Sequence, residues 1–121
     1  LEKMIREYQT LSNLQVDLHY EWVDVDMDVM IEDTIFRVIQ ESMTNAVRHG
    51  HASQMSLHFF EDEEDYLIEL QDNGVGFETL TYGYGLKQMM ERISILGGQL
   101  QFESRDGFFT RVSLPKYKEG R

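Results

Sequence analysis

The sequence contains no cysteine and few basic residues, and these two absences exclude several kinds of protein. Without cysteine there is no disulfide framework and no thiolate metal site, a composition that fits a reducing compartment. The 22 acidic residues outnumber the 11 basic ones and give a net charge of −11. A surface that binds nucleic acid or an anionic membrane needs a positive field, so we expect no nucleic-acid partner.

Long apolar runs are also missing. No stretch is long enough to cross a bilayer, and no signal peptide opens the chain. The chain begins at Leu1 in the middle of a helical pattern, so we expect it to be a piece of a longer protein. The motifs of P-loop ATPases, zinc proteases and serine hydrolases are absent, and Gly83-Tyr84-Gly85 lacks the third glycine of a dinucleotide fingerprint.

The residues that are present indicate one domain. A chain of 121 residues that is 41% hydrophobic can bury a single core. The charge is uneven: residues 1–78 carry 18 acidic and 4 basic side chains (−14), whereas residues 79–121 carry 4 and 7 (+3). A ligand that bears phosphate would therefore need specific donors, because no general basic field is available.

The hydrophobic spacing predicts three helices and five strands. The helices are expected at 1–13, from Asp28 to about 49, and at 86–96; the strands at 16–22, 55–59, 66–72, 99–104 and 108–114. We expect Asp28 to cap the long helix, and the acidic run 61–65 to form a solvated turn. The expected order of helices and strands, α-β-α-β-β-α-β-β, predicts a mixed sheet covered by helices on one face, an α/β two-layer sandwich.

The long helix combines an apolar face with a separate polar stripe. At 100° per residue, Glu41, Asn45 and Arg48 share the stripe. The apolar arc contains Ile31, Ile35, Val38, Ile39, Met43 and Ala46. Carboxylate and amide oxygens suit Mg²⁺, and an arginine suits phosphate. The alternative is a solvated face with an ordinary charge pair, although asparagine is a poor helix former there.

Asp72 ends a row of apolar residues on one face of the third strand. A buried carboxylate needs a donor, and the exocyclic amine of adenine would be one. The alternative is that Asp72 initiates an Asx turn in the sequence Asp-Asn-Gly. Gly83 and Gly85 open a helix whose first N–H groups suit an anion. A metal shared by His49 and His51 is disfavoured, because no third ligand lies nearby in the sequence.

Together these segments resemble the GHKL superfamily, which includes gyrase, a heat-shock chaperone, histidine kinases and mismatch-repair ATPases. The run from Glu41 to His49 resembles its asparagine box, 72–77 its first glycine box, and 83–86 its second. The ending from Gly107 through Thr110 to Pro115 is similar to the last box. The runs 37–41 and 90–98 resemble sensor histidine kinases of the nitrate-sensor, thermosensor and cell-wall-stress type. The resemblance covers about residues 14–115.

The resemblance implies a Bergerat fold, with a mixed, mostly antiparallel five-stranded sheet under about three helices, and a site for ATP and Mg²⁺. Glu41 and Asn45 would be catalytic and would hold the metal. The nucleotide-binding residues would be Asn45, Arg48, His49, Asp72, Gly74, Gly76, Gly83, Gly85, Leu86 and Thr110. Asp72 would bind the adenine amine, supported by Thr110. Two departures from the family pattern are a lid of six residues, 77–82, and Phe109 in place of a glycine before Thr110.

The resemblance also implies the partners. Residues 1–13 would join a dimerisation domain, and 14–121 would be the catalytic domain of a protein-histidine kinase. That domain would phosphorylate a histidine on the dimerisation domain, from which a response regulator takes the phosphate. We expect a monomeric isolated domain, a homodimeric parent kinase, and a cytoplasmic position in a membrane-anchored bacterial sensor. The alternatives are an anti-sigma factor serine kinase and a nucleotide-binding but inactive domain.

Overall fold

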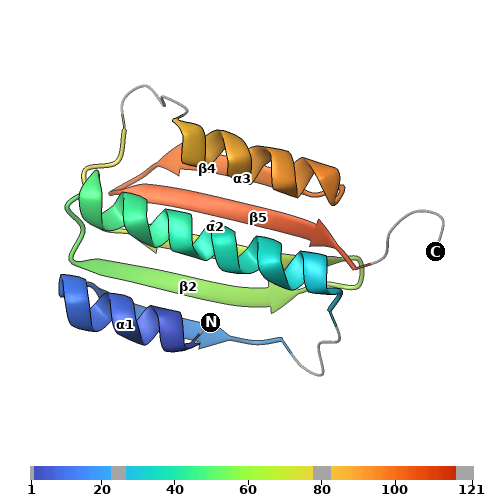
Figure 1. Ribbon diagram of the computed structural model, residues 1–121, viewed down its shortest axis with the longest axis horizontal. Helices are drawn as coiled ribbons and strands as arrows, with labels where there is room; N and C mark the ends of the chain where they lie inside the picture. The colour runs from blue at the N-terminus through green and yellow to red at the C-terminus, as the bar shows by residue number, and fades with distance from the viewer. Residues whose placement is uncertain (1, 23–26, 78–82, 117–121) are drawn as a thin grey trace.

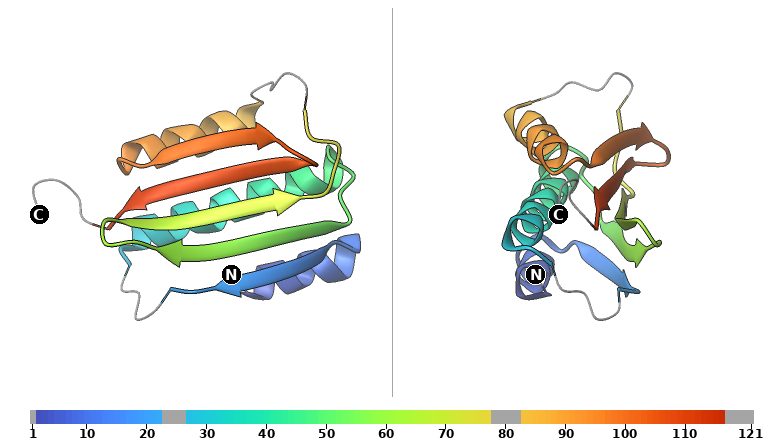
Figure 2. Two further views of the ribbon diagram at one scale, coloured as in Figure 1. Left: turned by 180° about the vertical axis from the view of Figure 1, so that it is seen from behind. Right: turned by 90° about the vertical axis from the view of Figure 1, so that its right-hand side faces the viewer.

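The computed structural model of the protein describes residues 2–22, 27–77 and 83–116 and has two layers (Figure 1). The elements in chain order are α1 (Glu2–Ser12), β1 (Gln15–Tyr20), α2 (Val29–Arg48), β2 (Gln54–Glu61), β3 (Asp65–Asp72), α3 (Tyr84–Ile95), β4 (Gln99–Ser104) and β5 (Phe108–Pro115). Seen edge-on, the helices lie on one face of the sheet and leave the other face open (Figure 2). The predicted α/β two-layer sandwich is confirmed.

The sheet has five strands in the order β1-β2-β3-β5-β4. β1 pairs with β2 in parallel, and the other three pairs are antiparallel, so the sheet is mixed and mostly antiparallel as expected. β3 and β5 are neighbours although α3 and β4 separate them in the chain. This pairing places Thr110 opposite Leu70, and thus brings the last motif beside the strand that ends in Asp72.

α2 lies across the middle of the sheet and supplies much of the core (Figure 1). The Asp28 carboxylate accepts the N–H of Met30 at 2.8 Å, which confirms the predicted N-cap. All six residues of the predicted apolar arc are buried, and Thr34 joins them. They pack on inward-facing strand residues such as Leu57, Ile68 and Val112. Among the described helices, none is long and apolar enough to span a membrane.

The edge strand β1 differs from its prediction. It ends at Tyr20 instead of residue 22, and Leu18 and Tyr20 are 40% and 54% exposed. The reason is that β1 has a neighbour on one side only, so alternation predicts the face of each residue and not the degree of burial. Trp22 is still buried, at 8% exposure, and it donates its ring N–H to the Phe60 carbonyl.

The acidic turn is shorter than predicted. Glu61 belongs to β2 and Asp65 to β3, which leaves 62–64 as the turn. Lys116 Nζ lies 2.6 Å from Glu61 Oε1, and this hydrogen bond raises the pKa of Lys116. Backbone N–H groups of Asp65 and Glu64 lower the pKa of Asp62. The turn is therefore tied to the end of β5 as well as to its own backbone.

Candidate functional site

A narrow cavity lies between α2, the sheet and the first turn of α3. Its lining consists of Ser42, Asn45, Met55, Leu70, Asp72, Leu86, Phe108 and Thr110. Four of the predicted site residues therefore meet at one place, although Asn45 and Thr110 are 65 positions apart in the sequence. The cavity volume is about 10 Å³, roughly the space for one water molecule. A purine would fit only if a wall of the cavity moved outward.

Asp72 is the buried carboxylate of this cavity, with 5% of its surface exposed. Its Oδ1 accepts the N–H of Gly74 at 2.8 Å and that of Phe108 at 2.9 Å. The first bond is the Asx turn that the sequence offered as the alternative. The second comes from β5, 36 positions away. Within the described residues Oδ2 makes no hydrogen bond, so one carboxylate oxygen remains to accept a donor.

The segment after Asp72 is anchored to the connection between α2 and β2. Asn73 Oδ1 accepts two consecutive backbone N–H groups, at residues 53 and 54, both at 2.9 Å. A Cβ at Gly74 would lie 2.5 Å from the carbonyl oxygen of Gly50, a distance that side-chain carbons do not reach. A glycine is therefore required at 74. The sequence analysis missed the anchoring role of Asn73, because its partners lie about twenty positions away.

Gly107 supports Asp72 from the other side. Its φ is +134°, and an added Cβ would lie 2.0 Å from the Asp72 carbonyl oxygen. Gly76 also lies in this region, with a φ of +66° beside Ser104. Gly76 and Gly107 therefore allow close contacts beside Asp72 that a larger residue at either position would break.

Replacing Gly107 with alanine is expected to destabilise the domain by about 3 kcal/mol, because strain at φ +134° adds to a clash with backbone. The midpoint of thermal unfolding should fall by roughly 10 °C. Gly83→Ala is the matched control, since nothing lies within 4 Å of a Cβ there, and its cost should stay below about 1 kcal/mol. Equal midpoints for the two variants would contradict the role assigned to Gly107.

The three residues of the polar stripe on α2 differ in how far they are buried. Glu41 and Asn45 are half-buried, whereas Arg48 is exposed. No ion pair joins Glu41 to Arg48 among the described residues, so the stripe is not the simple charge pair of the alternative interpretation. The Glu41 carboxylate instead lies against α3: a Cβ at Gly85 would stand 1.7 Å from Glu41 Oε1. Glycine at 85 thus leaves room for the Glu41 carboxylate, which a larger residue would displace.

The remaining predicted site residues lie outside the cavity. Arg48, His49 and Gly83 are exposed and do not line it, and most of the predicted lid, 78–82, lies outside the described residues. His51 is also exposed, at a φ of +53°. The described site therefore consists of a buried half around Asp72 and an open half along α2.

An ion-pair bridge outside the cavity joins α3 to α2. Asp33 Oδ2 lies 3.0 Å from Arg37 Nε and 3.3 Å from Arg92 Nη1. Arg92 belongs to the run 90–98 that resembles one kinase subgroup. Exposed ion pairs contribute little stability, so this bridge marks a contact between the two helices and adds little to the stability of the domain.

A family profile described as "Histidine kinase-, DNA gyrase B-, and HSP90-like ATPase" matches residues 30–118. The chain belongs to this family. Membership implies that the domain binds ATP, in agreement with the resemblance seen in the sequence. The match begins inside α2 and ends after β5, so it contains every residue of the cavity.

Two curated relatives carry the names of signalling proteins. The chain is 32% identical over 121 residues to "Signal transduction histidine-protein kinase/phosphatase UhpB" of Salmonella typhimurium, covering 96% of this chain and 24% of that protein. It is 34% identical over 98 residues to "Sensor protein VraS" of Staphylococcus epidermidis, covering 78% and 28%. The chain thus spans about a quarter of the length of these relatives.

Solved structures agree on the fold. "Acinetobacter baumannii histidine kinase AdeS" superposes with a TM-score of 0.80 at 20% identity, over 96% of this chain and 61% of that one. The histidine kinase domain of Erythrobacter litoralis EL346 gives 0.80 at 17% identity, over 94% and 58%. At these identities the similarity concerns the fold. It confirms the expected Bergerat architecture of the sheet and its helices.

Proposed function

We propose that this chain is the catalytic, ATP-binding domain of a sensor histidine kinase, which binds Mg-ATP and transfers the γ-phosphate to a histidine on a separate dimerisation domain. The observation that carries the proposal is the meeting of Asp72, Asn45, Leu86 and Thr110 around one cavity in a chain of this ATPase family. The similar sensor kinases favour this function over that of an anti-sigma factor serine kinase.

The adenine end of the site is built around Asp72. Its Oδ1 is occupied by the two backbone N–H groups, which leaves Oδ2 for the amine of the base. Thr110 is 2% exposed and lines the same cavity, so its hydroxyl would support that contact. Leu86, from the first turn of α3, lines the same cavity and would move outward with the lid, of which Gly83 and Gly85 would form the end.

The phosphate end lies along α2. Asn45 and Glu41 supply an amide and a carboxylate oxygen, a donor set that fits Mg²⁺. Arg48 and His49 lie further along the helix, are open to solvent, and would contact the phosphates or the ribose. Bound Mg²⁺ would neutralise charge on the triphosphate. Gly74 and Gly76 would let the intervening chain pass close to the base.

The acceptor is proposed to come from another domain of the parent protein. None of the four histidines of this chain, at 19, 49, 51 and 58, stands in the helical histidine–acid context of a phosphoacceptor. In the transfer, the bond between the γ-phosphorus and the bridging oxygen breaks, ADP leaves, and a P–N bond forms on the acceptor imidazole. A response regulator would then take the phosphate, and the parent kinase would be a homodimer at a membrane.

Mixing this domain with γ-labelled ATP, Mg²⁺ and the histidine-bearing domain of the parent kinase tests the proposal. We expect label on that second domain in an acid-labile, alkali-stable form, because phosphoramidates hydrolyse in acid. An acceptor whose histidine is replaced by glutamine should stay unlabelled. Label on a serine would favour the anti-sigma alternative, and ATP binding without any transfer would identify an inactive domain.

A further inference from the structure

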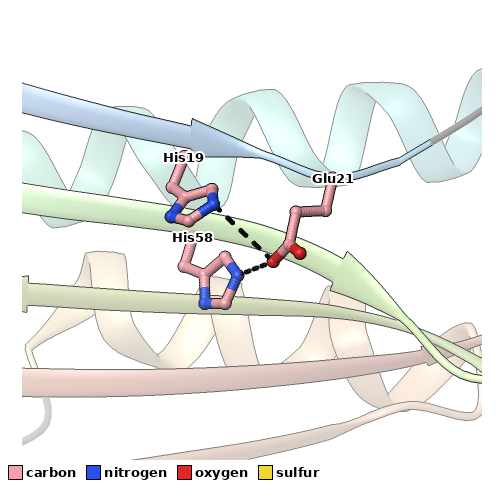
Figure 3. Close-up of side chains that lie close together, drawn as sticks. All are labelled: His19, Glu21 and His58. Carbon is pink, nitrogen blue, oxygen red and sulfur yellow. Dashed lines mark hydrogen bonds and ion pairs between the residues drawn. The ribbon is translucent and has the colours of Figure 1, made fainter.

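Three side chains on the open face of the sheet form a cluster that the nucleotide site does not use. His19 lies on β1, His58 on β2, and Glu21 directly follows β1. Figure 3 shows both imidazole rings turned toward the Glu21 carboxylate. In the described part of the chain, this is the one group of three such side chains whose ligand atoms lie within 4.8 Å of one another.

Backbone pairing holds the three together. His19 and His58 are direct partners in the parallel β1–β2 register, and their ring centroids are 4.7 Å apart. Glu21 shares the face of His19 by alternation, and its N–H donates to the Phe59 carbonyl at 2.7 Å, which extends the pairing past the end of β1. The cluster is therefore a product of strand register and does not depend on a mobile loop.

The distances are close to those of a metal site. His19 Nε2 is 3.9 Å from Glu21 Oε2, and His58 Nε2 is hydrogen-bonded to the same oxygen. Ligand atoms about 2.1 Å from a tetrahedral Zn²⁺ are about 3.4 Å apart. Small rotations of exposed side chains would bring all three to that spacing, with the metal replacing the proton between His58 and Glu21.

The surroundings favour these three as ligands. The Phe60 ring stacks on His58 with centroids 4.5 Å apart and restricts its rotation. Glu69 is the other strand neighbour of His58, and its Oε2 forms an ion pair with Arg111 Nη2 at 3.0 Å. Glu21 is therefore the carboxylate that contacts His58. His19 and Glu21 are 72% and 51% exposed, which keeps the site accessible to an ion and leaves a position for water.

We propose that His19, Glu21 and His58 bind a divalent transition-metal ion, with Zn²⁺ the best fit, and that the ion ties the edge strand β1 to β2. Two imidazoles and one carboxylate are zinc ligands, whereas Mg²⁺ prefers oxygen ligands alone. The three side chains stand in front of the strands with the helices behind the sheet (Figure 3), so the site lies on the opposite face from the helices and is independent of the nucleotide site.

Calorimetric titration of the 121-residue chain with ZnCl₂ tests the proposal. Excess MgCl₂ is included to occupy the general carboxylates of this acidic chain. We expect one ion per chain with micromolar affinity, weakened at least about tenfold by His19→Gln, by Glu21→Gln and by His58→Gln. His51→Asn is the matched control: it removes an exposed histidine elsewhere, asparagine tolerates its positive φ, and zinc affinity should be unchanged.

A second measurement separates binding at this site from loose association. With free Zn²⁺ about 100-fold above its dissociation constant, the thermal midpoint of the wild type should rise, because the ligand set exists only in the folded state. The rise should disappear in the His19→Gln/His58→Gln double variant. Zinc affinity equal in the double variant and the wild type, lost in His51→Asn, or absent in the wild type would each overturn the proposal.

Discussion

Asp72→Asn should weaken ATP binding by roughly 100-fold or more while leaving the fold intact. The substitution is isosteric, and the retained Oδ1 can still accept the N–H groups of Gly74 and Phe108. The second oxygen becomes an NH₂ group, which would meet the donor amine of adenine with another donor. An unpaired buried donor together with a lost charged hydrogen bond costs about 3 kcal/mol, and that corresponds to roughly 100-fold in affinity.

The measurement is calorimetric titration with ATP, accompanied by thermal unfolding of each variant. Asp65→Asn is the matched control, because it makes the same change of charge at the opposite end of the same strand. The control should bind ATP as the wild type does, and both variants should unfold within a few degrees of it. Undiminished ATP affinity in Asp72→Asn would refute the assignment of adenine to this carboxylate.

Asn45→Asp should leave the fold intact and reduce Mg-dependent phosphotransfer by at least about 100-fold. The new carboxylate would replace a neutral metal ligand and stand near the triphosphate. Two like charges 4 Å apart repel by about 4 kcal/mol at an effective dielectric constant of 20, and even part of that amounts to 100-fold. The readout is the initial rate at which label reaches the acceptor histidine, measured across Mg²⁺ concentrations.

Gln40→Glu is the control for this substitution. It makes the same amide-to-carboxylate change on the same helix, at an exposed position outside the polar stripe, and it should transfer phosphate at the wild-type rate. A normal rate in Asn45→Asp would refute the metal role of the amide. If both variants lost the same fraction of the phosphotransfer rate, the cause would be the added negative charge on α2 and not the loss of the Asn45 amide.

The surroundings of Asp72 were largely predictable from local sequence. Asp72 at the end of an apolar row, and the glycines that follow it, indicated a carboxylate beside a tight backbone approach, because strand alternation and turn chemistry depend on adjacent residues. The six apolar residues predicted for the buried face of α2 are all buried, because helical periodicity also depends on residues close together in the chain. The degree of burial of Leu18 was not predicted, since burial depends on which strand lies next to β1.

The polar stripe of α2 was predicted only in outline. Periodicity placed Glu41, Asn45 and Arg48 on one stripe, but it could not tell that the first two are half-buried while Arg48 is exposed. That difference arises because α3 packs over one end of the stripe, where Gly85 meets Glu41. The roles of Arg48 and His49 toward phosphate stay predictions.

The sequence by itself determined the absence of thiolate chemistry, the shortage of basic charge, the helices and strands, and the motifs of an ATPase family, since each depends on composition or on residues close together in the chain. Only the tertiary structure decided the strand order, the second N–H group on Asp72, the backbone contact that requires Gly107 to be glycine, and the pairing of His19 with His58. These features join residues tens of positions apart, and strand register sets them through the pairing of whole elements.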